Sequence, residues 1–442
     1  MEKKLIWISF GLSFLCFYLR AQVPSESHGF ALKVGKILTV TQGIIHHGTV
    51  LIENGKYLQI GKNLEIPAHF QVMELPEYWM MPGFIDLHSH IGASTDLWDT
   101  VLPLNHDLEL LPAIVEESKL FVRAIRGGVT TLLVIPGSGA NFAGFGVLLK
   151  PFGKSLAEMV LRYPGAMKVA QAYNPERRDG DFGVTRMGMS WGMRYVLEKG
   201  KRYHEAWVQF ESGKTTTPPK KDPELELLRG LFQRKYPVLV HTAGSRDVMS
   251  TMRMFHDDYH LWVVLSHGCF DAYKVAPEFA RRGLHLNLGP RLYDYYFARE
   301  RRMVNLAQQY NQAEVNFSLC TDAPVIPQVD LSLQATLSAR LGLNEEKALA
   351  ALTINPARAI GIGDRVGSIE VGKDADFILK KGSPFDVRIP MEWVFINGKK
   401  VYDRAEEIER DPSLQSLPSP ILLDCCSDDE AIFLEEYKRD HE

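Results

Sequence analysis

Two regions near the ends of the chain alternate apolar and polar residues with the period of two that is typical of β-strands. The first covers residues 30–80 and contains an Asn-Gly hairpin signal at 54–55. The second covers residues 363–404 and has the same turn pair at 397–398. Because these regions flank one long stretch of different character, they predict a single composite β domain built from both ends of the chain.

Between them, residues 81–362 alternate short apolar runs with helical patterns, which indicates βα units and a parallel sheet. The predicted strands cover 83–88, 130–135, 166–170, 238–241, 262–267, 284–288 and 315–321. The predicted helices cover 112–127, 224–235, 344–353 and 356–361. One more strand is expected within 186–210, and the total then suits an eight-stranded barrel. The pattern alone is also compatible with an open, doubly wound sheet.

The two ends and one internal stretch have a different composition. Residues 1–21 have the form of a signal peptide, because an apolar run at 5–19 follows two lysines and is too short to span a bilayer as a helix. We therefore expect an exported protein, periplasmic or secreted, and an uncleaved N-terminal anchor is the alternative. Residues 405–442 are acidic and are expected to form a poorly packed tail, and 175–223 are expected to form long loops over the catalytic face.

Composition and charge narrow the class of protein. With 442 residues, 45% hydrophobic and 24% charged, the chain is long enough for a barrel-sized core and a smaller domain. The net charge of −4 gives no basic region for nucleic acid, so we exclude a nucleic-acid partner. The four cysteines outside the signal segment form no disulfide framework: they are Cys269, Cys320, Cys425 and Cys426.

The first predicted strand of the central region ends in His88-Ser89-His90. In an extended strand the side chains at i and i+2 share a face, so both histidines can reach one metal ion. Asp86 shares that face and is expected to orient a ligand imidazole through its second nitrogen. Taken alone, the pair is equally compatible with ordinary polar side chains on a strand.

Three later strands also end in a residue that can bind a metal, namely His241, His267 and Asp322. The carboxyl ends of parallel barrel strands open on one face, so these residues are expected to meet the first histidine pair there. Each has a simpler explanation by itself, since an Asp after a strand is often a helix N-cap, but their coincidence predicts a metal site. Its donors would be His88, His90, His241, His267 and Asp322.

Nitrogen and oxygen donors without a thiolate favour one or two divalent ions, with Zn first and Mn, Fe or Co as alternatives. Lys168 is the candidate for a carboxylated bridging ligand, and a lysine at a strand edge is the other interpretation. Such a site lowers the pKa of a bound water to about 7 and polarises a substrate carbonyl. Asp322 could then take the proton of that water and pass it to a leaving nitrogen.

Polar residues on predicted loops could bind the substrate. Arg186, Arg246 and Tyr293 are candidates for holding a substrate carboxylate, although each is also compatible with a structural surface role. The glycine-rich turn at 136–139 lacks the lysine of a phosphate-binding loop and is interpreted as a tight βα turn.

Five sequence motifs carry a family resemblance: MPGFIDLHSH at 81–90, GGVTT at 127–131, TDAP at 321–324, TINPAR at 353–358 and GSIEVGKDAD at 367–376. Over most of residues 30–404 the chain resembles the amidohydrolase superfamily, in its imidazolonepropionase-like and prolidase-like branch. The resemblance implies an α/β fold, a TIM-like (β/α)8 barrel with a composite β-sandwich. It also implies a mononuclear or binuclear metal centre, hydrolysis of C–N bonds, and Asp322 as the catalytic acid/base.

The chain departs from that pattern at three positions. Relatives in this branch often carry a histidine where this chain has Ala243 and another where it has Ala323, and a glutamate where it has Tyr173. These differences leave the number of metal ions and the substrate open. The deaminase branch usually places a glutamate shortly after the third histidine, and the absence of one at 242–247 favours an amide hydrolase.

The sequence therefore predicts a metal-dependent hydrolase that cleaves a C–N bond in a small molecule, such as an amide, a cyclic amide or a dipeptide. A barrel that has lost catalysis and acts as a binding or scaffold protein is the first alternative, and a metal-dependent deaminase is the second. The expected partner is a small-molecule substrate, and the sequence is compatible with a homo-oligomer.

Overall fold

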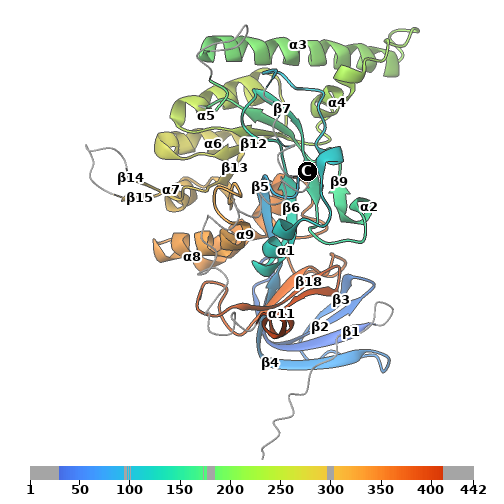
Figure 1. Ribbon diagram of the computed structural model, residues 1–442, viewed down its shortest axis with the longest axis vertical. Coiled ribbons are helices and arrows are strands. Elements are labelled where there is room, and N and C mark those ends of the chain that lie inside the picture. Colours follow the sequence, from blue (N-terminus) through green and yellow to red (C-terminus); the bar gives the residue numbers. More distant parts are fainter. Residues whose placement is uncertain are drawn as a thin grey trace, which may run out of the picture.

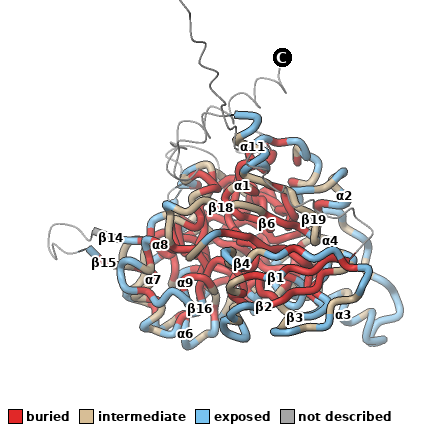
Figure 2. Tube along the Cα trace, turned by 90° about the horizontal axis from the view of Figure 1, so that it is seen from below, coloured by how far each residue is buried: buried red, intermediate tan, exposed pale blue. Residues whose placement is uncertain are grey.

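The computed structural model describes residues 29–93, 97, 99, 101–172, 174–176, 185–295 and 303–411. Within them a large β-sheet lies at one end of the molecule, and the α/β region, with the long helix α3 outermost, extends away from it (Figure 1). The predicted signal segment, Tyr173 and residues 412–442 lie outside the described residues. Burial concentrates in the strands, and the exposed residues lie mainly on the surrounding helices and loops (Figure 2).

The end sheet contains strands from both ends of the chain in the order β19-β18-β17-β4-β1-β2-β3. Its strands are β1 (Phe30–Leu38), β2 (Ile44–Glu53), β3 (Lys56–Gly61), β4 (Gln71–Pro82), β17 (Phe377–Lys380), β18 (Met391–Ile396) and β19 (Lys399–Asp403). Strand β4 joins the two sets, because it pairs in parallel with β1 and antiparallel with β17. The two strand-rich regions of the sequence therefore form one continuous sheet.

The central strands carry the candidate site. They are β5 (Phe84–Ser89), β6 (Val129–Val134), β7 (Phe142–Phe145), β8 (Val147–Leu149), β10 (Met167–Ala170), β11 (Val238–His241), β12 (Val263–His267), β13 (His285–Leu288) and β16 (Asn316–Leu319). Strands β10, β11, β12, β13 and β16 pair in parallel with their neighbours, and β5 pairs in parallel with β6. A parallel bridge between Ser89 and Ala323 joins β5 to the segment after β16.

Residues 142–149 fill the remaining gap, which lies between β6 and β10. Strand β7 pairs antiparallel with β10, and β8 pairs antiparallel with β6, with only Gly146 between β7 and β8. A Cβ atom on Gly146 would lie 2.4 Å from the carbonyl oxygen of Val134, so glycine permits this close approach. The pairings among the described strands thus return to β5 and form a ring, in which β7 and β8 follow each other as one antiparallel segment.

The sequence placed the eighth strand within 186–210, and that prediction was wrong. The stretch forms the 26-residue helix α3 (Arg186–Glu211), which also replaces most of the long loops expected over 175–223. Its glycines weaken the helical pattern. One of them, Gly200, lets α3 approach α4 (Pro223–Phe232) closely, since a Cβ there would lie 3.1 Å from the Phe232 ring.

The other helices lie around the strands. They are α1 (Lys119–Arg126), α2 (Leu156–Met159), α5 (Ser245–Thr251), which continues as a π-helix (Met252–Asp258), α6 (Ala276–Arg282), α7 (Leu306–Gln312), α8 (Leu331–Arg340), α9 (Glu345–Leu352), α10 (Ile354–Ala359) and α11 (Arg404–Arg410). Short 3-10 turns occur at Leu111–Ala113, Phe270–Val275 and Gln328–Asp330, and the remaining strands are β9 (Val160–Arg162), β14 (Tyr293–Tyr295) and β15 (Met303–Asn305). No helix in the described ranges is long and apolar enough to cross a membrane.

The beginning of the predicted C-terminal tail is ordered as α11. The side-chain hydroxyl of Tyr402 donates to Glu407 at 2.7 Å, and Arg126 of α1 forms an ion pair with the same carboxylate. Residues 405–410 are therefore helical, although none of the α11 residues is buried.

The segment that begins with α10 closes the ring at the amino-terminal ends of its strands. The indole Nε1 of Trp262 donates to the carbonyl of Ala359 at 3.1 Å, and Arg162 donates to the carbonyl of Ile360 at 2.6 Å. Apolar residues of the segment pack with interior residues of the ring in one buried cluster that includes Ala357, Ile360, Ile362, Leu133, Leu239 and Val264. The TINPAR motif at 353–358 therefore lies at the amino-terminal end of the ring.

A buried ion cluster ties the ring to the end sheet. The Lys150 ammonium, directly after β8, lies 3.0 Å from an Asp374 oxygen and 2.7 Å from an Asp376 oxygen, and donates to Asn397 at 2.6 Å. The Lys150 side chain is only 1% exposed, so the described structure holds it almost fully out of water. This contact fixes the position of the two parts relative to each other.

Candidate metal centre

All six residues predicted as metal donors lie at or inside the carboxyl-terminal side of the ring. His88 is in β5 and His90 follows it, His241 and His267 are the last residues of β11 and β12, and Asp322 comes three residues after β16. Lys168 lies in β10, and its alignment opposite Leu239 of β11 directs it into the ring interior. The strand register therefore brings together residues that are up to 234 positions apart in the chain.

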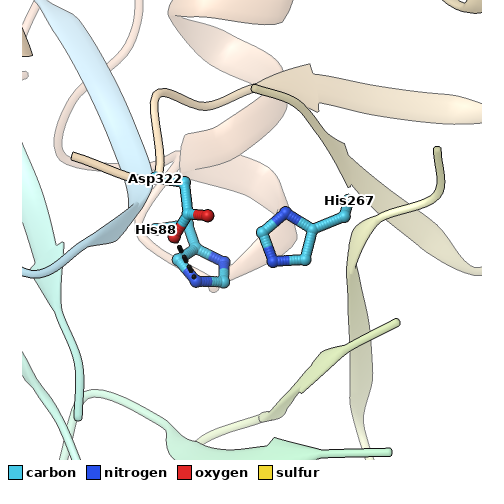
Figure 3. Close-up of side chains that lie close together, drawn as sticks. All are labelled: His88, His267 and Asp322. Atoms are coloured by element: carbon cyan, nitrogen blue, oxygen red, sulfur yellow. Dashed lines mark ion pairs between the residues drawn. The ribbon is translucent and has the colours of Figure 1, made fainter. Parts of the chain in front are cut away.

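The side chains meet at short distances around Asp322. One of its carboxylate oxygens lies 3.2 Å from His88 Nε2 and 3.2 Å from His90 Nε2. The Lys168 ammonium nitrogen lies 2.9 Å from His88 Nε2. Donor atoms of His88, His267 and Asp322 all lie within 4.8 Å of one another, and Figure 3 shows these side chains facing the same space.

The histidine rings form a contiguous group. The centroids of the His88 and His267 rings are 4.5 Å apart, and those of His241 and His267 are 4.4 Å apart. The His88 and His90 rings are 5.1 Å apart and nearly perpendicular. The four imidazoles are therefore close enough to surround one or two ions.

Hydrogen bonds to the second ring nitrogen determine which nitrogen is available. His90 Nδ1 donates to the Ile135 carbonyl at 2.8 Å, and His267 Nδ1 donates to the Gly289 carbonyl at 2.7 Å. A carbonyl only accepts, so Nδ1 carries the hydrogen and Nε2 keeps its lone pair. The Nε2 atom of His267 is buried without a hydrogen-bond partner in the described structure, which fits a metal ligand.

The two other histidines contact serine hydroxyls. His88 Nδ1 lies 2.9 Å from the Ser266 hydroxyl, and His241 Nδ1 lies 3.1 Å from the Ser138 hydroxyl. Sequence reasoning missed both serines. Ser266 carried a weak signal, as a polar residue within an otherwise apolar strand, and the glycine-rich turn at 136–139 proves to supply the partner of His241.

Asp86 does not orient an imidazole, and the expectation that it would do so was wrong. Its carboxylate accepts hydrogen bonds from the His88 amide at 2.9 Å, from the Thr321 amide at 2.9 Å and hydroxyl at 2.7 Å, and from the Gln328 side chain at 2.7 Å. Burial raises the pKa of Asp86 to about 6, although these hydrogen bonds oppose the rise. Asp86 thus fixes the backbone on which His88 and Asp322 are carried.

Burial sets the protonation states at the centre. It lowers the pKa values of His88, His241 and His267, so these imidazoles are held in the neutral form that binds metals. It also lowers the pKa of Lys168 to about 7. Burial alone would raise the pKa of Asp322, but the neighbouring imidazoles of His88 and His267 outweigh it and hold that pKa well below its ordinary value.

Two residues of the centre have backbone conformations that are uncommon outside glycine. The φ angle is 76° at His267 and 54° at Asp322, in the left-handed region. Histidine and aspartate tolerate this region better than most residues, and such strain is often found at functional sites. The chain therefore turns at His267 and at Asp322, the two residues whose side chains face the site.

Comparison with known proteins decides the family. Residues 79–405 match the amidohydrolase family, which is well over half of the chain. The chain belongs to the amidohydrolase family. It is therefore a hydrolase that acts on carbon–nitrogen bonds.

Individual relatives agree with this assignment. The amidohydrolase is 25% identical over 400 residues to Amidohydrolase tasK of Hapsidospora irregularis, with 80% of this chain covered, but it spans only 40% of that relative's length. It is 24% identical over 395 residues to an imidazolonepropionase of Shewanella oneidensis, covering 77% of this chain and 88% of the relative.

Among solved structures, an amidohydrolase from Thermotoga maritima MSB8 superposes with a TM-score of 0.78 at 28% identity, over 85% of this chain and all of that one. A prolidase complexed with n-methylphosphonate-l-proline gives a TM-score of 0.53 at 16% identity, over 85% of this chain and all of that one, which shows a shared fold alone. The likeness implies an α/β fold with a TIM-like barrel and an additional sheet domain.

The candidate substrate residues of the amidohydrolase do not join the metal-site group. Arg186 already forms ion pairs with Glu176, at 3.1 Å, and with Asp247. Arg246 is exposed, and Tyr293 is 47% exposed on β14. No contact in the described residues links either side chain to the metal donors.

Two of the three positions that depart from the family pattern, Ala243 and Ala323, lie within the described residues. Ala243 is 4% exposed and Ala323 is fully buried, and the Ala323 carbonyl accepts from the His90 amide at 2.8 Å. Both alanines lie in the wall beside the donors, so neither position offers a ligand. His88, His267 and Asp322 have donor atoms within 4.8 Å of one another, and the full set of six donors stays a prediction.

Proposed function

We propose that this amidohydrolase is a metal-dependent enzyme that hydrolyses the C–N bond of an amide, a cyclic amide or a dipeptide in a small molecule. The convergence of four imidazoles and a carboxylate carries the proposal. The name of its relative, an imidazolonepropionase, supports a small-molecule substrate of this kind. We also infer that the ring of strand pairings is a closed TIM-like barrel with one antiparallel segment, formed by β7 and β8.

The residues present fit a divalent metal. His90 and His267 direct Nε2 lone pairs inward, because their Nδ1 atoms are engaged by carbonyls. Together with His88, His241 and Asp322 they would hold one or two ions, and Lys168, with its ammonium nitrogen 2.9 Å from His88 Nε2, is placed beside the same donors. Their nitrogen and oxygen donors suit zinc. A bound ion would acidify the attacking water and polarise the substrate carbonyl.

Asp322 is the proposed acid and base. Its low pKa keeps it a carboxylate, which can accept the proton of the attacking water as the C–O bond forms. It can return that proton to the leaving nitrogen as the C–N bond breaks, so that the amine departs neutral. The left-handed turn at Asp322 and the hydrogen bonds that Asp86 makes with Thr321 position the carboxylate for both steps.

Replacement of Asp322 tests this role. Asp322→Asn keeps the shape of the side chain but cannot accept a proton, so turnover is expected to fall by roughly 10²- to 10⁴-fold. Metal content, measured by elemental analysis of the purified protein, is expected to stay near that of the unmodified chain. The exposed Asp364→Asn is the matched control, and an active Asp322→Asn enzyme would contradict the assignment.

A substrate screen separates the alternatives. Hydrolysis is measured over amides, cyclic imides and dipeptides with added Zn or Mn. Protein that binds no metal and is not activated by either ion would favour a scaffold. Release of ammonia from aminated heterocycles would identify a deaminase.

We also propose that the protein is exported. The support is the apolar run at residues 5–19. Cell fractionation of the full chain, with sequencing of its mature amino terminus, measures whether residues 1–21 are removed.

A further inference from the structure

A pocket of about 510 Å³ lies at the end of the ring opposite the metal centre. Its wall includes the residues at which three parallel strands begin, whereas His267 and Asp322 lie at or beyond the ends of two of them. These wall residues are Val263 of β12, His285 of β13 and Asn316 of β16. The volume falls in the range of sites for small molecules.

Basic side chains dominate the polar lining of this pocket. The charged ones are the arginines Arg234, Arg282 and Arg358, and the imidazoles of His256 and His285 also line the pocket. The lining contains no aspartate or glutamate. A cavity lined by one sign of charge concentrates ligands of the opposite sign.

Two of these cations are not neutralised by neighbouring carboxylates. Arg282 forms ion pairs with Asp257, at 2.8 Å, and with Glu278, and His256 also contacts Asp257 at 2.8 Å. By contrast, Arg234 and Arg358 have exposed side chains and no ion pair within the described ranges. The pocket therefore keeps two guanidinium groups available to a ligand.

Both arginines come from well-anchored backbone. Arg234 follows α4 with its amide bonded to the Leu231 carbonyl at 2.9 Å. Arg358 lies in α10, whose Asn355 side chain donates to the Phe317 carbonyl at 2.8 Å. His285 extends from the pocket wall to the Ser318 hydroxyl at 2.9 Å, so the wall is continuous with the buried interior. A ligand here would meet a preformed surface.

We propose that this pocket binds a phosphate group, free or carried by a small metabolite, between Arg234 and Arg358. The planar guanidinium matches phosphate oxygens with two parallel hydrogen bonds, and two such groups balance a dianion. The volume exceeds the needs of a bare phosphate and leaves room for an attached organic part. This second ligand site is independent of the proposed hydrolysis, because it shares no residue with the metal centre.

Titration calorimetry of the full chain tests the proposal with inorganic phosphate and with glucose 6-phosphate. Arg234→Gln and Arg358→Gln each remove one charged donor and are expected to weaken binding by about tenfold or more. The double variant is expected to show no measurable binding. Arg340→Gln, at an exposed position outside the pocket, is the matched control and should bind like the unmodified chain.

The comparison between the two ligands distinguishes the sources of phosphate. Tighter binding of glucose 6-phosphate indicates a phosphorylated metabolite, and tighter binding of inorganic phosphate indicates the free ion. The proposal is overturned if the unmodified chain binds neither ligand at millimolar concentration. It is equally overturned if the double variant, shown by thermal melting to be folded, binds as tightly as the control, since the anion would then lie elsewhere, such as at the metal centre.

Discussion

At the scale of single residues, Lys168 is an unusual group in the interior of the ring of strands. It has no exposed surface, and its ammonium nitrogen lies 2.9 Å from His88 Nε2. With a pKa lowered to about 7 by burial, a large fraction of the side chain is neutral near physiological pH. A neutral amine can add carbon dioxide to form a carbamate, whereas an ammonium cannot, so this environment supports the proposed carboxylated ligand.

Shortening this side chain tests that role. Lys168→Ala is expected to lower metal content and to reduce activity by about 10- to 100-fold. If a carbamate is the ligand, added acetate or propionate should restore part of the activity by occupying the vacated space. Lys168→Met fills that space and serves as the control that carboxylates should not restore. Equal behaviour of both variants would count against a carbamate.

His285 gives a prediction about acid stability. Burial lowers its pKa to about 3, whereas an unfolded chain binds the proton near 6.5. As the pH falls from 6.5 towards 3, only the unfolded state gains this proton, so the free energy of unfolding decreases. His285→Gln cannot titrate, and its loss of stability between pH 6 and 4 should be smaller by about 2 kcal/mol.

Urea unfolding at the two pH values measures this difference. His46→Gln, at an exposed position, is the control and should retain the pH dependence of the unmodified chain. An unchanged pH dependence in His285→Gln would show that the imidazole is not held neutral.

The convergence of the candidate metal donors could be predicted from the sequence, but their hydrogen-bond partners could not. The donors end apolar strands, and parallel strands bring their carboxyl ends together. Two of the four imidazole partners are the backbone carbonyls of Ile135 and Gly289, which have no side-chain signature. The role of Asp86 was misjudged because a shared strand face does not reveal which backbone amides approach from another strand.

At the scale of elements, the segment 142–149 shows what periodicity misses. Its parallel neighbours were predicted well, and the bounds of β11 agree with the expected 238–241. Strands β7 and β8 are four and three residues long and are interrupted by Gly144 and Gly146, so the apolar pattern is too short to stand out. The glycines of α3 had the same effect on a helical pattern, because they hid a long helix.

The same segment gives a stability prediction. The Gly146 amide donates to the Ala166 carbonyl at 2.9 Å and its carbonyl accepts from Gly165 at 2.7 Å, so the backbone cannot easily move away from Val134. Gly146→Ala is expected to cost about 3 kcal/mol in the free energy of unfolding through overpacking. Urea denaturation measures the cost.

Gly61→Ala is the control for this substitution. Its added methyl would meet only the flexible Leu64 side chain, at 3.2 Å, so a small effect is expected. Equal effects at the two positions would show that the close approach at Gly146 is not required.

At the scale of the whole molecule, Lys150 links the ring of strands to the end sheet. Lys150→Met leaves the carboxylates of Asp374 and Asp376 buried with less compensation, which is expected to destabilise the protein by about 3–5 kcal/mol. Lys56 contacts the same Asp374 at 3.0 Å, but its side chain is 54% exposed, so Lys56→Met should cost less than about 1 kcal/mol. Chemical denaturation of both variants makes the comparison, and equal costs would contradict the structural role of Lys150.

The composite sheet could be expected from two strand-rich ends with matching turns. The order of the strands within that sheet could not be expected. Nothing in the alternating pattern shows that β4 lies between β1 and β17, since that order depends on contacts between segments nearly 300 residues apart. The buried lysine was hidden for the same reason, because its partners lie in a different part of the chain.

The position of β4 also has a consequence for biosynthesis. One edge of β4 stays unpaired until β17 has been synthesised. The 294 residues 83–376 are made between these two strands. At ribosomal rates of about 5–20 residues per second, that interval is on the order of 15–60 s. The amino-terminal strands spend this time with an open edge, available to chaperones. The native sheet can form only after β17 has been made, so completion of this sheet comes late in the synthesis of the chain.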